Sequence, residues 1–385
     1  MRAVPRLAAV YGMAALLTLG GMGCSRLMPA ATGASGDAII TFEASDGRFA
    51  CCALLDLGAT GYLAVGRVDY LDGRSRAWLA RMGPFGERQW DHELAAQLEH
   101  SALTGGAVTA TGEIYVVGWS SGARRQLLLV SKVQPDGNPE WMRTSALRLD
   151  TKAEAVIVSR DGSLVVAGFT RESGLTGSVF LASLNRSGDM SWQWPVTDAN
   201  ELPWVRLVES ATGGFIVAGM FGITHVDTDG RRRWEHRDID ALSALEDSAG
   251  NVLVVGGVQD APGRSRSEVQ KLSNRGALLW RHPLGDLCWI AGSWPSPRGG
   301  IIVAGNPCET VGELWLAEVS TEGRAMGVTR LTLPRDAQAY RAEATRDGHV
   351  IAAGGFIQAT ADGKDHPDAL KGWFLKTGRP VRYTK

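Results

Sequence analysis

The motif that comes nearest to catalytic chemistry in this sequence is a G-x-S-x-G pattern at residues 118–122, with Ser120 at its centre. In a nucleophile elbow, such a serine stands on a sharp turn between a strand and a helix, which exposes its hydroxyl group. Here an apolar stretch precedes the pattern, and residues 126–133 form another apolar stretch with the character of a strand. Because no helix follows, we interpret the match as chance and assign no catalytic residue.

Three histidines are candidates for metal ligation, because each follows a recurring tryptophan by two residues: His92, His236 and His282. They belong to different repeat units and should diverge in space, whereas zinc needs its ligands within about 2.0–2.1 Å of one point. Residues 362–368 form an acidic loop whose oxygens suit calcium, but the spacing fits no EF-hand. We therefore predict neither a metal site nor a cofactor.

Two of the five cysteines are candidates for a disulfide bond. Cys288 and Cys308 flank two apolar stretches that should form a hairpin with its turn near residues 295–300, which brings the two thiols close together. Cys51 and Cys52 are adjacent, so on a strand their side chains point to opposite faces. We interpret this second pair as two buried small apolar residues. A vicinal disulfide is the alternative.

The first 23 residues have the form of a secretory signal peptide. Arg2 and Arg6 precede an uncharged, mostly apolar stretch at residues 7–19, which is too short for a typical membrane span. The cysteine that follows, Cys24, resembles the lipidated cysteine of bacterial lipoproteins. That resemblance implies a fatty-acylated Cys24 and a flexible tether at residues 24–37. It also implies export to the cell envelope, with the outer membrane as the expected destination. Ordinary signal cleavage, with Cys24 incidental, is the alternative.

One phrase recurs along the rest of the chain: an apolar run, then a small residue, then glycine. The phrase ends at Gly66, Gly118, Gly168, Gly219, Gly256, Gly305 and Gly354. A second phrase, Gly-x-x-x-Trp, follows in five of the units and ends at Trp90, Trp141, Trp192, Trp234 and Trp280. A period of about fifty residues is typical of propeller blades. Each unit has four short apolar stretches separated by turns, so we predict an all-β, seven-bladed β-propeller of four-stranded antiparallel blades at residues 38–385.

The last unit has only three strands of its own, whereas the apolar stretch at residues 38–44 precedes the first unit and belongs to none. We predict that residues 38–44 complete the seventh blade by pairing with residues 373–376, which closes the ring. The recurring tryptophans are expected to pack between neighbouring blades. Sugar binding on their exposed faces is the alternative.

The stretch DGSLVVAGFT, followed by VFLASLNRSGDMSWQW, resembles the glycine-rich propeller repeats of the delta-60 and SBBP type in secreted bacterial proteins. It resembles the quinoprotein-like propellers more loosely. The resemblance covers roughly residues 38–380 as a repeat pattern. It implies the fold and says little about function, because propellers serve as enzymes, scaffolds and adhesins.

The formal net charge of −1 over 385 residues provides no electrostatic attraction to nucleic acid. We favour a non-catalytic, lipid-anchored scaffold that binds an envelope protein or a glycan. Its expected contact surface is the rim formed by the long loops at residues 69–76, 260–267 and 358–371, because binding residues concentrate on loops over a rigid scaffold. The alternative is a propeller enzyme or carbohydrate-binding protein that uses the central depression.

The lipid anchor can be tested by metabolic labelling with a radiolabelled fatty acid. The wild-type protein should carry the label and Cys24→Ser should lose it, because the thiol is the acceptor. Cys52→Ser is the matched control and should remain labelled. A label that persists in Cys24→Ser would remove the anchor from this interpretation.

Overall fold

The computed structural model describes residues 31–32, 38–43, 47–94, 98–122, 125–145, 147, 150–173, 176–200, 204–261, 264–285, 287–356 and 371–381. The expected signal peptide, Cys24 and the acidic loop at 362–368 lie outside these residues. Among the described residues, no helix is both long and apolar enough to cross a membrane.

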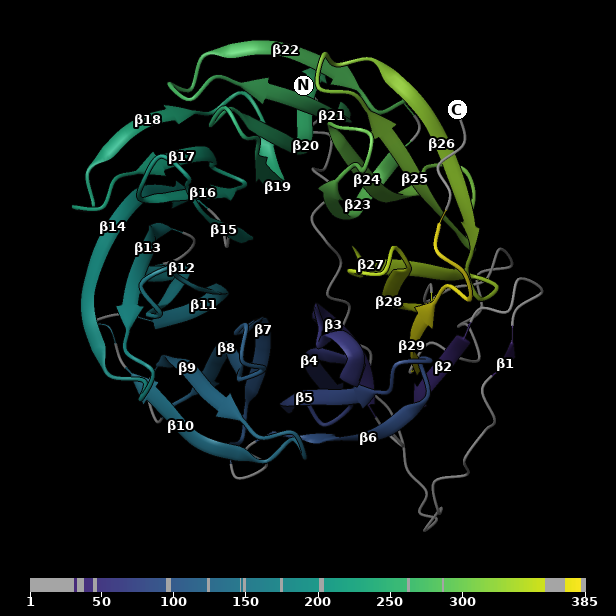
Figure 1. Ribbon diagram of the computed structural model, residues 1–385. Coiled ribbons are helices and arrows are strands. Elements are labelled where there is room, and N and C mark those ends of the chain that lie inside the picture. The colour runs from purple at the N-terminus through teal and green to yellow at the C-terminus, as the bar shows by residue number, and fades with distance from the viewer. Residues whose placement is uncertain are drawn as a thin grey trace, which may run out of the picture.

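Seven antiparallel sheets, the blades, stand around a common centre (Figure 1). The first blade contains β3 (Gly47–Asp56), β4 (Tyr62–Tyr70), β5 (Ser75–Met82) and β6 (Arg88–Glu93). The second contains β7 (Ser101–Val108), β8 (Ile114–Ser121), β9 (Gln126–Val133) and β10 (Pro139–Ser145). The third contains β11 (Asp150–Val158), β12 (Leu164–Ser173), β13 (Thr176–Leu184) and β14 (Met190–Asn200). The fourth contains β15 (Val205–Glu209), β16 (Phe215–Gly219), β17 (Gly222–Val226) and β18 (Arg232–His236).

The remaining blades follow the same order. The fifth contains β19 (Asp240–Glu246), β20 (Val252–Ala261), β21 (Arg264–Leu272) and β22 (Leu278–Pro283). The sixth contains β23 (Leu287–Pro295), β24 (Ile301–Pro307), β25 (Glu313–Val319) and β26 (Ala325–Thr332). The seventh contains β27 (Ala337–Ala344), β28 (Val350–Phe356), β29 (Lys371–Lys376), β2 (Ala38–Glu43) and β1 (Ala31–Thr32). A short 3-10 turn, η1 (Gly58–Thr60), connects β3 to β4.

The predicted seven-bladed propeller is confirmed. In Figure 1 the first strand of each blade faces the centre of the ring, and the last strand lies at its outer edge. The first two strands of each blade form an antiparallel pair. In every blade except the fourth, the register of this pair shifts at a bulge in the inner strand.

The glycine that ends the recurring phrase lies on the second strand of the blade, opposite the part of the inner strand where this bulge occurs. A Cβ atom placed on Gly118 would lie 1.9 Å from the carbonyl oxygen of Ala102, and one on Gly354 would lie 1.9 Å from that of Gln338. Real Cβ atoms do not approach backbone oxygens so closely. The repeat therefore keeps glycine here because the backbone of the inner strand occupies the space of a side chain.

The hydrophobic core lies between the blades. Its main clusters each combine buried residues of two neighbouring blades, and together they cover the seven interfaces of the ring. In one of them, Leu63 and Leu79 of the first blade pack with Leu103 and Leu129 of the second. Both faces of each sheet are thus buried, which explains the nearly continuous apolar runs in the sequence.

The recurring tryptophans also connect neighbouring blades, as predicted. The ring of Trp141 lies against Gly188 of the next blade, where a Cβ atom would come within 2.7 Å of it. Trp280 repeats this contact at Gly323 and donates a hydrogen bond from Nε1 to the carbonyl oxygen of Thr321, at 3.1 Å. In the third blade, Trp194 takes the place against the glycine of the next blade, at Gly230, while Trp192 reaches the same blade through Phe215, with the ring centroids 6.1 Å apart. Trp192 stacks on Trp194 with the ring centroids 3.7 Å apart.

The ring closes as predicted, by a strand from the N-terminal part of the chain. β2 pairs antiparallel with β29, in a register that runs from Ala38 opposite Lys376 to Glu43 opposite Lys371. Ile40 of β2 is buried in the cluster between the seventh and first blades. The two residues of β1, which belong to the segment expected to be a tether, pair with the outer side of β2.

Deleting residues 38–44 should destabilise the protein severely, because it exposes the edge of β29 and removes Ile39 and Ile40 from the core. Burial of one isoleucine contributes about 1.5–3 kcal/mol. Deletion of residues 25–30 is the control and should leave stability nearly unchanged. Thermal unfolding and solubility of the two truncations measure the difference. Equal stability of both would contradict closure by β2.

Candidate functional site

A cavity of about 500 Å³ occupies the centre of the ring. This volume is within the range of small-molecule sites in proteins. Most of its wall consists of small and apolar side chains from the inner strands of the blades. Its charged side chains come from four of the blades: Asp56, Glu154, Arg206, Arg341, Glu343 and Arg346.

Two arginines interrupt an otherwise small-residue position of the repeat. In each blade, one residue of the inner strand pairs with the residue that directly precedes the recurring glycine on the second strand. This inner-strand residue is small in five blades: Ala53, Gly105, Ala155, Ser243 and Gly292. In the fourth and seventh blades the same position holds Arg206 and Arg341. Their strands, β15 and β27, lie on opposite sides of the centre in Figure 1. Alignment of the repeat units reveals these two arginines as exceptions in the sequence, whereas the glycine and tryptophan phrases alone do not.

Arg341 is held in place by the backbone and by an aromatic ring. Its Nε donates a hydrogen bond to the carbonyl oxygen of Cys52 in the first blade, and its Nη1 donates one to that of Tyr340, at 3.0 Å. Its guanidinium lies 5.3 Å from the ring centroid of Trp204, which precedes β15. Arg341 therefore reaches across the central cavity, which we call the channel. Three independent contacts restrict the orientation of its side chain.

Trp204 belongs to an aromatic pair at the end of the channel where the inner strands begin. Its ring meets that of Trp289 edge to face, with the centroids 5.6 Å apart and the planes at 75°. Both rings are exposed, Trp289 to 46%. Trp204 comes from the fourth blade and Trp289 from the sixth, so the pair bridges two blades that are not neighbours. Exposed indole faces beside a charged cavity are suited to binding a flat, partly apolar ligand.

Among the described residues, Arg206 makes one hydrogen bond, from Nη1 to the carbonyl oxygen of Val205, at 3.3 Å. No ion pair joins Arg206 or Arg341 to an acidic residue of the described part of the chain. The positive charge of Arg341 and burial together lower the pKa of Arg206 to about 9. The channel therefore holds two like charges that repel each other, with no carboxylate in direct contact.

Glu154 and Glu343 supply two carboxyl groups to the same cavity. Burial within the ring raises the pKa of each to about 7, although Arg206 and Arg341 act in the opposite direction. The side chain of Glu343 is open to the channel, but the blades enclose it and reduce its hydration. Acid–base catalysis generally uses carboxyl groups whose environments separate their pKa values. The pKa values of Glu154 and Glu343 are raised to the same extent, so their surroundings do not divide the two residues into an acid and a base.

The adjacent cysteines have different environments, as the alternation along a strand predicts. Cys51 packs in the cluster between the seventh and first blades, whereas Cys52 lines the channel. Both side chains are half-buried, so the expectation of two buried residues holds only in part, and Cys52 lies on the face that the inner strand turns to the channel. Both thiols are free. Burial raises the pKa of Cys52, and raises that of Cys51 to about 12, so neither is an activated nucleophile.

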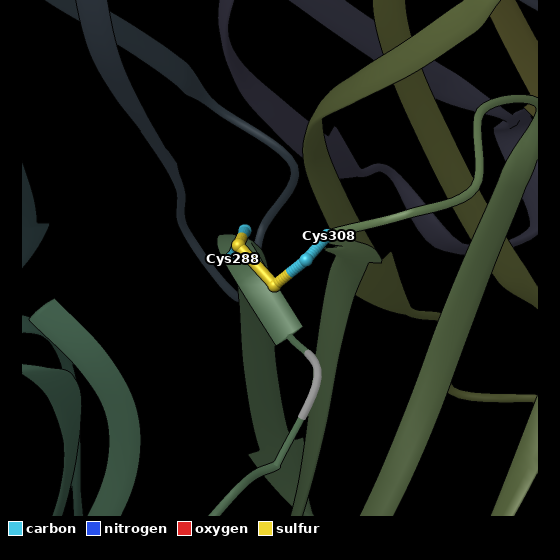
Figure 2. The surroundings of a disulfide bond; sticks show 2 residues. All are labelled: Cys288 and Cys308. Atoms are coloured by element: carbon cyan, nitrogen blue, oxygen red, sulfur yellow. A yellow bond between two sulfur atoms is a disulfide. The ribbon is translucent and has the colours of Figure 1, made fainter. Parts of the chain in front are cut away.

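Cys288 and Cys308 are bonded to each other in the structure (Figure 2), with their Cα atoms 5.0 Å apart. Cys288 lies where the register of β23 against β24 shifts, between Leu287 and Trp289. The disulfide therefore restricts the motion of the backbone next to the exposed indole of Trp289. Only the tertiary structure relates this disulfide to the channel.

The other sequence candidates lie outside the channel. Ser120 is buried within β8, and β9 follows it, so there is no nucleophile elbow. His92 bonds to the carbonyl oxygen of Gly137 in the next blade, at 3.0 Å, and His236 bonds to Gln270, at 2.8 Å. These two histidines serve contacts between blades. In the part of the chain that the structure describes, no group of three potential metal-binding side chains occurs.

Comparison with known proteins identifies the fold and nothing narrower. No family model matches the chain, and no curated protein matches its sequence. The solved structure of polysaccharide lyase Uly1 is 10% identical, with a TM-score of 0.54 over 85% of this chain and 89% of that one. BBS1N in complex with ARL6DN is 14% identical, with a TM-score of 0.51 over 89% and 98%. YCF48 bound to D1 peptide is 11% identical, with a TM-score of 0.51 over 93% and 100%.

The raised pKa values of the two glutamates predict how stability depends on pH. Between their ordinary pKa of 4.5 and about 7, the folded protein keeps protons that the unfolded chain has lost. The free energy of unfolding should therefore fall as pH rises through this window. Glu154→Gln should raise stability at pH 8, by on the order of 1 kcal/mol, and flatten the dependence. Urea unfolding at pH 5 and pH 8 measures this. The control, Glu99→Gln, should behave as wild type, and an unchanged slope in Glu154→Gln would refute the assignment.

We predict that Cys288 and Cys308 are bonded in the protein isolated from cells and that Cys51 and Cys52 are free. Non-reducing peptide mapping should recover the first pair linked and the second pair alkylated. Serine at both 288 and 308 should lower the free energy of unfolding by about 3 kcal/mol in the chain-entropy model, given a separation of 20 residues. Recovery of all four thiols alkylated would overturn the pairing.

Proposed function

We propose that this protein is a non-catalytic binding protein of the bacterial cell envelope, anchored by lipid at Cys24, and that its ligand occupies the central channel. The observation that carries this proposal is the convergence of Arg206, Arg341, Glu154 and Glu343 in one cavity. A propeller does not need the two arginines there, because small residues fill the positions equivalent to Arg206 and Arg341 in the five other blades. Charged groups kept at a cost in stability indicate a functional site.

Two features favour binding over catalysis. The wall of the cavity contains no histidine, and the two free thiols among the described residues are not activated. The two carboxyl groups have matched pKa values, which suits hydrogen bonding to a ligand better than a division of acid and base roles.

A partner protein at the rim is compatible with this role. The structures of BBS1N with ARL6DN and of YCF48 with D1 peptide are complexes of similar propellers, so the fold accommodates such partners. Of the three rim loops expected from the sequence, only the one at residues 69–76 is described throughout. The channel, with its defined charges, is therefore the site on which we base the function.

The proposal is tested by thermal unfolding against a defined panel of neutral and acidic saccharides, amino acids, short peptides, nucleotides and inorganic anions. At least one member should raise the Tm of the wild type, because a ligand at 100 times its Kd contributes about 2.7 kcal/mol. Ser243→Trp fills the channel and should abolish that shift. Ser187→Trp, in an exposed turn, is the matched control and should retain it. If every ligand that stabilises the wild type raises the Tm of all three proteins equally, the channel is excluded as the binding site.

A further inference from the structure

Neither channel arginine forms an ion pair with a carboxylate of the described residues, although Glu154 and Glu343 line the same cavity. Within the described residues, Nε and Nη2 of Arg206 have no hydrogen-bond acceptor, and neither has Nη2 of Arg341. Both side chains line the cavity. Free guanidinium donors in an enclosed space form a preorganised site for an oxyanion, because the planar fork matches the two oxygens of a carboxylate.

The glutamates limit the charge of that anion. At pH 7 each carboxyl group is about half ionised, so together the two glutamates carry about one negative charge against the two arginines. A single carboxylate then brings these four groups close to neutral, whereas a dianion such as phosphate leaves an excess negative charge. In their protonated form, they donate a hydrogen bond, and in their ionised form they accept one. Hydroxyl groups on the ligand satisfy either state, so the glutamates suit a ligand that carries hydroxyls beside its carboxylate.

The aromatic pair adds a third chemical requirement. Trp204 lines the cavity with the guanidinium of Arg341 over its ring, and Trp289, which does not itself line the cavity, offers an exposed indole next to Trp204 at the mouth of the channel. An indole face binds the apolar C–H surface of a sugar ring, and the polar groups around it bind the ring substituents. The disulfide next to Trp289 reduces the entropy that the indole would lose on binding.

We propose that the channel binds an acidic saccharide, with the carboxylate of a uronate unit held between Arg206 and Arg341, its hydroxyls on Glu154 and Glu343, and its ring against Trp289. This inference rests on the proposed binding function and names the class of ligand. It assigns Arg206 and Arg341 to the carboxylate and Trp289 to the sugar ring. Removing an arginine therefore affects any carboxylate ligand, and removing the indole affects only the saccharide.

Binding should also depend on pH. Ionisation of the glutamates adds negative charge next to the ligand, so affinity should fall as pH rises from 6 to 8. The charged groups around Glu154 are Lys152 of its own strand and three arginines from other blades: Arg67, Arg206 and Arg341. Those around Glu343 are Asp56, Arg206 and Arg341. Arg206, whose pKa is lowered to about 9, stays largely protonated over this range. Glu154→Gln should reduce the pH dependence.

The test is calorimetric titration of the full-length protein, purified from membranes in a neutral detergent. The probes are trisaccharides of galacturonate, glucuronate, mannuronate and guluronate, each paired with its neutral hexose counterpart. A triglutamate peptide and inorganic phosphate are the competing anions. At least one uronate should bind the wild type at least tenfold more tightly than its neutral counterpart, the peptide and phosphate.

Single-residue variants then locate the contacts. Arg206→Gln and Arg341→Gln should each weaken uronate binding at least tenfold, and Trp289→Ala should weaken it without exposing the core. Arg231→Gln, at an exposed turn, is the matched control and should bind as wild type. Uronate binding that is unchanged in both arginine variants overturns the assignment.

Other outcomes separate this inference from the proposed function. If no uronate binds, or if the peptide or phosphate binds more tightly than every uronate, the acidic saccharide is wrong. A channel ligand found by the unfolding panel and lost in Ser243→Trp would then still support the binding function. Equal affinity for a uronate and its neutral counterpart would exclude the carboxylate site.

Discussion

The pairing of β2 with β29 is the interaction on which the rest of the structure depends. Every blade buries both of its faces against neighbours, and this is possible for all seven only in a closed ring. Closure joins a strand near the N-terminus to the last strand of the chain, so it comes with a large loss of chain entropy. The hydrogen bonds of β2 and the burial of Ile40 offset that loss at one interface.

The candidate site is built across that same interface. Arg341 of the seventh blade donates its Nε hydrogen bond to Cys52 of the first, and the backbone N–H of Arg346 donates to the carboxylate of Asp56, at 3.1 Å. The position of one channel arginine thus depends directly on closure. The function proposed for the channel and the stability of the fold have a common structural basis here, because both need the first and seventh blades in contact.

The repeat and its exceptions have different physical origins. Glycine recurs because the backbone of the inner strand leaves no room for a side chain, and tryptophan recurs because each interface between blades needs a large apolar group. Neither requirement explains Arg206 and Arg341, since small residues fill the equivalent positions of the other blades. They also raise the energy of the fold by mutual repulsion in an enclosed space. A repeat protein therefore reveals its candidate site where a unit departs from the pattern at the expense of stability.

The sequence by itself determined the architecture. Seven glycine phrases, five tryptophan phrases and an unassigned strand at residues 38–44 predicted the blades, the contacts between them and the closing pair, because each depends on local pattern and on repetition. It also brought Cys288 and Cys308 together, since one hairpin connects them. The composition of the channel was decided only by the tertiary structure. Arg206 and Arg341 are distant in sequence, and Trp204 meets Trp289 across blades that are not neighbours. Such contacts depend on how the ring curves and how long each side chain reaches, and a one-dimensional period contains neither quantity.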